Sequence, residues 1–201
     1  MSEEKRGFLV AVEGIDGSGK STVARELARH LREEGLKVTL RQEPSQGPFG
    51  TRARTFGPKR PLSAALFFTM DREQSRPSLE RSLRTHEVVV QDRSFYSTLA
   101  YQGSQVSLRE RKELAQLQRE LTIVPDLVVL LHGPVDVAVG RVRHRSRVLH
   151  PFKKERFLRQ VQQEYLNLAR REKERFVRIP FDQDPESVLG AAKAAVLRRV
   201  V

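Results

Sequence analysis

The residues from Gly14 to Ser21, GIDGSGKS, have the types and spacing of a loop that binds phosphate groups. Its glycines carry no Cβ and therefore let backbone N–H groups turn inward around phosphate oxygens. Lys20 places an ammonium group on the β- and γ-phosphates, and the Ser21 hydroxyl is a ligand for Mg²⁺. An apolar run precedes the loop and a helical pattern follows it, as a P-loop requires. The sequence therefore predicts binding of a nucleoside triphosphate by Gly14, Asp16, Gly17, Ser18, Gly19, Lys20, Ser21 and Thr22.

Asp92 and Arg93 directly follow another apolar run, Val88–Val90. If this run is a strand of a parallel sheet, both side chains lie at its carboxyl end, where open α/β sheets bind their ligands. This position makes both residues candidates for a functional site. The alternative is a structural ion pair between the two side chains.

Phe68 and Arg72 are four residues apart, so they share a face if the segment is helical. Leu66 and Phe67 lie alongside, and one of the two phenylalanines is expected in the core. Phe68 is therefore either a core residue or a neighbour of Arg72 on a binding face.

Short apolar runs alternate with helical patterns along the whole chain. Helices are expected from Val23 to a stop at Gly35, over Pro61–Leu83 with an interruption near Pro77, and over Leu108–Leu121. Further helices are expected around residues 157–168 and from residue 185, and a loop with a short helix over residues 45–61. The strands are expected at Phe8–Val12, Val38–Leu40, Val88–Val90, Leu127–Leu131 and Phe176–Ile179.

This alternation predicts a three-layer α/β fold of the P-loop NTPase type, with a five-stranded parallel sheet and helices on both faces. The 201 residues are expected to form a single domain, 1–201, because the chain contains no linker or repeat.

The composition narrows the classes of partner. The chain has 37 Lys and Arg against 25 Asp and Glu, a net charge of +12, which attracts polyanions or simply makes a solvated basic surface. Aromatic residues make up only 6%, so a stacking platform for single strands is not indicated and nucleic acid is not expected as a partner. The absence of cysteine excludes disulfides and thiolate metal sites. Because no bilayer-length apolar run or secretory signal is found, a cytoplasmic protein without membrane contact is expected.

Four segments of the chain carry a resemblance to a known family: FLVAVEGIDGSGKST, RQEPSQGPFGTRAR, LFFTMDREQ and VVVQDRSFYSTLAYQG. In this order and at this spacing they resemble the thymidylate kinase family of P-loop nucleoside monophosphate kinases. The resemblance implies phosphorylation of dTMP to dTDP with ATP and Mg²⁺. It also implies a homodimer that forms through helices packed on the sheet.

The resemblance further implies a role for each matching residue. Asp16 faces the acceptor nucleotide and receives its 3′-hydroxyl, although the residue can also be read as a solvated turn aspartate. Phe68 stacks on the thymine and Arg72 hydrogen-bonds its carbonyl edge. Arg93 binds the acceptor phosphate, and Asp92 helps to hold Mg²⁺ or its water shell. The remaining positions are Arg54 near the acceptor phosphate, with Thr98 and Tyr101 lining the base and the 2′ side of the sugar.

In this family a glycine at the position of Gly17 accompanies a catalytic arginine from a lid. The Arg-rich segment of about 141–154 is the expected lid, and Arg143 and Arg147 are the candidates that would join Lys20 and Arg93 in catalysis. The alternative is a basic loop without a catalytic role, whose charges are screened by salt.

The chain also departs from the family pattern. Ser94 replaces an aromatic residue or histidine, and His132 stands at a strand end where an acid is usual. Two alternatives therefore remain: a kinase for another nucleoside monophosphate, or a P-loop ATPase paralog that binds nucleic acid.

Overall fold

The computed structural model describes residues 6–56, 60–145 and 155–200. The strands are β1 (Phe8–Gly14), β2 (Val38–Gln42), β3 (Val88–Asp92), β4 (Leu127–His132) and β5 (Phe176–Pro180). The helices are α1 (Lys20–Glu33), α2 (Pro48–Phe56), α3 (Pro61–Thr85), α4 (Phe95–Tyr101), α5 (Leu108–Leu121), α6 (Val135–Arg145), α7 (Glu155–Arg171) and α8 (Pro185–Val200), with a short 3₁₀ turn at Gly103–Gln105. Within these residues, no helix combines the length and apolarity needed to span a bilayer.

The five strands form one parallel sheet in the order β2-β3-β1-β4-β5. β1 is the central strand, and its Val10 pairs with Val90 of β3 on one side and with Leu127 of β4 on the other. The apolar runs of β1, β3 and β4 are continuous rather than alternating because helices cover both faces of the sheet. The predicted α/β fold with a five-stranded parallel sheet is confirmed.

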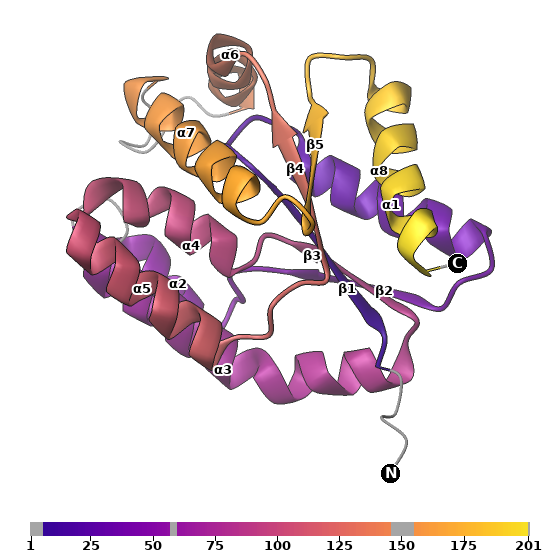
Figure 1. The fold of residues 1–201 in the computed structure, drawn as a ribbon, viewed down its shortest axis with the longest axis horizontal. Helices are drawn as coiled ribbons and strands as arrows, with labels where there is room; N and C mark the ends of the chain where they lie inside the picture. Colours follow the sequence, from indigo (N-terminus) through magenta and orange to yellow (C-terminus); the bar gives the residue numbers. More distant parts are fainter. Residues whose placement is uncertain (1–5, 57–59, 146–154, 201) are drawn as a thin grey trace.

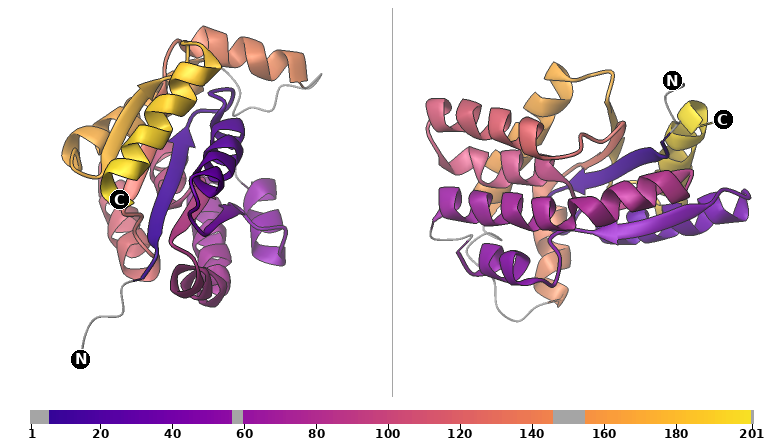
Figure 2. Two further views of the ribbon diagram at one scale, coloured as in Figure 1. Left: turned by 90° about the vertical axis from the view of Figure 1, so that its right-hand side faces the viewer. Right: turned by 90° about the horizontal axis from the view of Figure 1, so that it is seen from below.

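The helices form a layer on each face of the sheet. α1 and α8 lie together on one face, whereas α3, α4 and α7 lie on the other, with α2 and α5 packed outside them (Figure 1; Figure 2). α7 shows why the chain folds this way, because its apolar positions Leu158, Val161 and Tyr165 recur at helical spacing and are all fully buried. The carboxyl ends of β1 and β3 are thereby left for the site described below.

α3 differs from the expectation of a helix interrupted near Pro77. The structure has one helix from Pro61 to Thr85 that runs through this proline. Proline removes only one backbone hydrogen bond, the one to the carbonyl of Glu73, and the helix is held in place by buried residues on both sides of it. Packing therefore outweighs the local preference.

Two helices were not expected. α4 follows the Asp92-Arg93 pair after one residue, its N-cap Ser94, whose side chain accepts a hydrogen bond from the Tyr96 N–H. α6 extends to Arg145 and includes the first part of the segment expected as a lid. The rest of that segment, 146–154, lies outside the described residues.

Candidate active site

The phosphate-binding loop connects the end of β1 to the start of α1, as the motif predicts. Gly19 is the N-cap of α1 and has a φ of +91°, in the left-handed region that favours glycine. Gly17 has a φ of +88°, and a Cβ there would lie 2.1 Å from the carbonyl oxygen of Ala138 in α6. Glycine is therefore required at Gly17 for a second reason, because the loop lies directly against α6.

Lys20 is buried at the first position of α1, with its Nζ 3.4 Å from both the carbonyl oxygen of Ile15 and Oδ1 of Asp16. Burial and the positive charge of Arg93 lower the pKa of Lys20 to about 8, although the carboxylate of Asp16 acts in the opposite direction. An anion bound in the loop would favour the charged ammonium. Ser21 and Thr22 follow on the exposed first turn of α1.

Arg93 and Asp16 join the end of β3 to the loop. Nη2 of Arg93 donates to Oδ1 of Asp16 at 2.5 Å, and its guanidinium carbon lies 5.3 Å from the centre of the Tyr101 ring. Burial raises the pKa of Asp16, but the charges of Lys20 and Arg93 outweigh it and lower the pKa to about 2. Burial also opposes the charge on Arg93, yet the surrounding acidic and tyrosine side chains raise its pKa. The pair is therefore ionised at neutral pH.

The seven residues expected around an acceptor nucleotide all line one pocket beside the loop, with a volume of about 570 Å³. Such a volume suits a small organic ligand. The side chains come from the loop, α2, α3, the end of β3 and α4: Asp16, Arg54, Phe68, Arg72, Arg93, Thr98 and Tyr101. Sequence spacing alone did not require them to meet.

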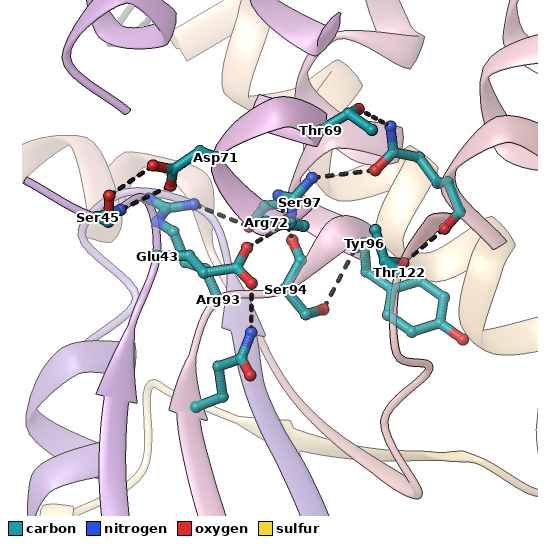
Figure 3. A network of polar contacts seen from close by, with 12 residues as sticks. Glu43, Ser45, Thr69, Asp71, Arg72, Arg93, Ser94, Tyr96, Ser97 and Thr122 are labelled. Atoms are coloured by element: carbon teal, nitrogen blue, oxygen red, sulfur yellow. Dashed lines mark hydrogen bonds and ion pairs between the residues drawn. The ribbon is translucent and has the colours of Figure 1, made fainter. Parts of the chain in front are cut away.

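Arg72 is fixed at this pocket by three acceptors from different elements. Its Nε donates to Oε2 of Glu43 at 2.6 Å, Nη1 to Oε1 of Gln118 at 3.0 Å, and Nη2 to the carbonyl oxygen of Ser94 at 3.1 Å (Figure 3). Burial raises the pKa of Glu43, although the charge of Arg72 acts in the opposite direction. A guanidinium has five N–H donors, so two N–H groups of Arg72 remain for a ligand.

The two adjacent phenylalanines of α3 are both only half-buried, so the expectation that one of them lies in the core is wrong. Phe67 stacks on Phe56 of α2, with ring centres 5.4 Å apart and an interplanar angle of 4°. Phe68 lines the pocket. α2 supplies the partner for Phe67, and the core is filled from other elements.

Three buried polar atoms at the site have no hydrogen-bond partner among the described residues: Oγ of Ser18 in the loop, Oδ1 of Asp92 and Oγ1 of Thr98. Such atoms are rare in folded proteins and indicate a missing partner such as water, an ion or a ligand. Thr98 lines the pocket, and Asp92 pairs in register with Val12 of β1, just before the loop.

Asp92 and Ser21 carry the kind of oxygen atoms that a magnesium ion bound together with a nucleotide would use. Mg²⁺ usually takes one or two protein oxygens together with waters and substrate phosphates. In the described part of the chain, no three His, Cys, Asp or Glu side chains gather as a complete metal site.

The three remaining arginines are placed differently. Arg54 donates to the carbonyl oxygens of Pro44 and Ser45, at 3.4 and 3.0 Å, and lines the pocket. Arg143 is exposed on α6. Arg147 lies outside the described residues.

Sequence reasoning missed two acidic residues of the site. Glu43 holds Arg72, and Glu13 is a fully buried carboxylate in β1 next to the loop. The signal for Glu13 was a single acid at the end of the apolar run FLVAVEG, where an ionised side chain needs several partners.

The central strand ends in a P-loop, and the neighbouring pocket shares Asp16 with this loop. This combination defines a P-loop protein of the nucleotide kinase class. The sequence profile of the family described as Thymidylate kinase matches residues 12–190. The chain belongs to the thymidylate kinase family.

Curated relatives agree with this assignment. The probable thymidylate kinase of Archaeoglobus fulgidus is 34% identical over 164 residues, which cover 81% of this chain and 82% of the relative. That of Metallosphaera sedula is 38% identical over 163 residues, covering 81% and 80%. The thymidylate kinase of Xanthomonas campestris is 38% identical over 144 residues, covering 70% of this chain and 62% of the relative.

Proposed function

We propose that this protein is a thymidylate kinase, which transfers the γ-phosphoryl group of ATP to the phosphate of dTMP. An oxygen of the acceptor phosphate bonds to the γ-phosphorus, the bond from this phosphorus to the β,γ-bridging oxygen breaks, and dTDP and ADP leave. The observation that carries the proposal is the contact of Arg93 with Asp16, because it joins the triphosphate loop to the acceptor pocket. Membership of the thymidylate kinase family supports the choice of dTMP.

On the donor side, backbone N–H groups of the phosphate-binding loop would surround the phosphates of ATP, and Lys20 would bind the β- and γ-phosphates. Ser21 and Asp92 would hold Mg²⁺ or its water shell. The ion would neutralise charge on the phosphates. The unpartnered Oδ1 of Asp92 supports this assignment.

On the acceptor side, Phe68 would stack on the thymine while the two spare N–H groups of Arg72 bind its carbonyl edge. Arg93 and Arg54 would bind the 5′-phosphate. Thr98 has a free hydroxyl for the ligand. The ring of Tyr101 would pack against the 2′ carbon and exclude ribonucleotides sterically. The pocket supplies all these groups within its volume of about 570 Å³.

Asp16 would receive the 3′-hydroxyl of the acceptor. Its Oδ1 accepts from both Lys20 and Arg93, whereas Oδ2 has no hydrogen bond from the described residues. An ionised carboxylate oxygen is a strong acceptor for a hydroxyl group. The pair with Arg93 therefore fixes Asp16 and leaves one oxygen for the sugar.

Catalysis would depend on position and charge rather than on a protein base. The attacking phosphate oxygen is already an anion, so no side chain has to remove a proton. Lys20 and Arg93 would hold the two phosphates in line and neutralise the transferring group. Arg143 is a candidate third charge, because α6 contacts the loop at Gly17. Arg147, the other candidate, stays a prediction.

The proposal includes a homodimer. Leu62, Leu66 and Met70 lie four residues apart on α3, and their side chains are 39%, 52% and 45% exposed. Such an apolar stripe on one helix face is suited to a partner. We also place the enzyme in the cytoplasm, where its charged substrates are found.

A panel of acceptors tests the function. Purified protein with ATP and Mg²⁺ is given each common nucleoside monophosphate in turn, and ADP formation is measured. A clear preference for dTMP over dUMP, dCMP, dAMP, dGMP and the ribonucleotides is expected. Preference for another monophosphate would refute the thymine assignment. Turnover of no acceptor, with ATP hydrolysis stimulated by polynucleotide, would refute the kinase.

A further inference from the structure

Glu13 lies in the centre of the protein, directly before the phosphate-binding loop, and has an exposed fraction of 0%. Its carboxylate accepts four hydrogen bonds. Oε1 accepts from the N–H and the hydroxyl of Ser94, at 2.7 and 2.8 Å, and Oε2 accepts from the hydroxyls of Ser97 and Tyr165, at 2.7 and 2.8 Å. A buried charge is costly unless it is satisfied in this way. The free-energy cost of burying this charge next to the loop suggests that Glu13 has a role at the site.

We propose that Glu13 is a positioning residue for the acceptor site, which holds the backbone and the guanidinium of Arg93 through Ser94 and Ser97. The inference rests on the proposed function, in which Arg93 binds the acceptor phosphate. Arg93 and Ser97 line the pocket, whereas Glu13 itself does not.

The backbone of Arg93 needs such support. Its backbone φ is +73°, and among the described residues it is the only one other than glycine with a positive φ. A residue that carries a side chain is strained in the left-handed backbone region, and this conformation persists only where the surrounding structure enforces it. β1 accepts two hydrogen bonds, one on each side of this torsion angle. The carbonyl oxygen of Val12 accepts from the Arg93 N–H at 3.1 Å, and the carboxylate of Glu13 accepts from the Ser94 N–H.

The side chain of Arg93 is held by the same carboxylate through Ser97. Nη1 of Arg93 donates to the Ser97 hydroxyl oxygen at 3.1 Å. A hydroxyl has one proton, and that of Ser97 is given to Oε2 of Glu13, so its oxygen stays free to accept from Arg93. The proton of Tyr165 also goes to Glu13. Glu13 thereby sets the direction of the hydrogen bond that aligns the guanidinium.

The charge of Glu13 acts in the same sense, because it is one of the carboxylates that favour the charged forms of Arg93 and Lys20. Ser94 contributes twice, since its hydroxyl donates to Glu13 and accepts from the Tyr96 N–H at the start of α4. The strained residue is therefore placed between two rigid elements, β1 and α4.

Glu13→Gln is the test, because it keeps the shape of the side chain and changes one acceptor into a donor. The Ser94 N–H can only donate, so the amide oxygen must face Ser94 and the NH2 group must face Ser97. The Ser97 hydroxyl oxygen then accepts this N–H, and the protons of the Ser97 and Tyr165 hydroxyls, whose oxygens lie 3.0 Å apart, lose the carboxylate oxygen that accepted both of them. The hydroxyl that accepts from Arg93 must therefore reorient. We expect kcat/KM for dTMP to fall about 100-fold. The Kd of ATP is expected to stay within about threefold, because the loop keeps its own contacts.

A double-mutant cycle separates positioning from general damage. If Glu13 acts through Arg93, then Glu13→Gln has little further effect on kcat/KM for dTMP in an Arg93→Ala background. Independent, additive losses would overturn the proposal. Tyr96→Phe is the matched control, since it removes a tyrosine hydrogen bond of 2.6 Å to Glu172 from the same helix α4. Tyr96→Phe is expected to leave the balance between the use of dTMP and the binding of ATP unchanged.

Two further measurements keep the proposal falsifiable. If Glu13→Gln does not fold, as judged by circular dichroism and thermal melting, Ser97→Ala breaks the same chain of contacts and is expected to lower kcat/KM for dTMP about tenfold. A crystal structure of the folded variant gives a reading that does not depend on activity. Arg93 is expected to leave its φ of +73° or to lose its contact with Ser97. Unchanged geometry would overturn the inference, whereas a wild-type protein without kinase activity would refute the proposed function.

Discussion

The hydroxyl oxygen of Tyr101 accepts a hydrogen bond of 2.9 Å from the backbone N–H of Asp16. One wall of the acceptor pocket is thus attached to the phosphate-binding loop. Burial and the charge of Asp16 raise the pKa of Tyr101, so its hydroxyl keeps its proton at neutral pH. This hydrogen bond therefore ties the position of Tyr101 at the end of α4 to that of Asp16 in the loop.

Tyr101→Phe should lower stability modestly and weaken the use of both nucleotides. The change leaves the Asp16 N–H without its acceptor, which costs about 1 kcal/mol. The ring remains, so discrimination against the ribonucleotide should be kept. Thermal melting and the KM values for ATP and dTMP measure these effects, with Tyr96→Phe on the same helix as the control. A loss of ribonucleotide exclusion would contradict the assignment of this role to the ring.

Asp16→Asn should damage the acceptor side more than ATP binding. An amide oxygen is a weaker acceptor than a carboxylate for the 3′-hydroxyl, and the charged contact with Arg93 is lost. A charged hydrogen bond is worth about 1.5–3 kcal/mol, so we expect kcat/KM for dTMP to fall about 10- to 100-fold. The Kd of ATP is measured alongside. Equal loss of both would mean that Asp16 belongs to the triphosphate site.

ATP binding should weaken above about pH 8. The pKa of Lys20 is about 8 in the free protein, and bound phosphates would raise it because they favour the ammonium. The full contribution of Lys20 to affinity is therefore present below pH 8 and is lost as pH rises through the pKa of the complex. The expected loss is up to about tenfold in affinity per pH unit, measured by calorimetry from pH 7 to 9.5. Lys20→Arg, which stays charged, should show a flat profile.

Arg72→Lys should weaken dTMP selectively. Lysine keeps the charge but cannot reach the Glu43, Gln118 and Ser94 acceptors and the base together, because it has one nitrogen in place of three. We expect KM for dTMP to rise about tenfold or more, with KM for ATP unchanged. An unchanged KM for dTMP would show that the thymine edge is recognised by other groups.

Leu66→Lys should break the proposed dimer. Its side chain is 52% exposed in the middle of the α3 stripe, and a charge there would be buried against the partner. Sedimentation velocity should give a dimer for the wild type and a monomer for the variant. Leu108→Lys is the matched control, because Leu108 is 64% exposed on α5 and should leave the dimer intact. A monomeric wild type would refute this part of the proposal.

Much of the fold was predictable because its signals are local. Apolar runs bounded by glycine or polar residues gave the five strands, and the spacing of Val161 and Tyr165 gave α7. Pro77 shows the limit of local reasoning, because α3 continues through it where packing on both sides outweighs one lost hydrogen bond. α4 is only seven residues long, too short to show a period in the sequence.

The sequence by itself determined the phosphate-binding loop, since its chemistry depends on neighbouring residues whose order alone places the glycines, Lys20 and Ser21. The family resemblance predicted which residues bind the acceptor but not how their side chains are arranged around it. Only the tertiary structure decided that Arg72 is held by Glu43 and that Glu13 supports Arg93, because these partners are far apart along the chain. A buried charge is stabilised by whichever donors the fold brings to it, and those donors are set by packing in three dimensions.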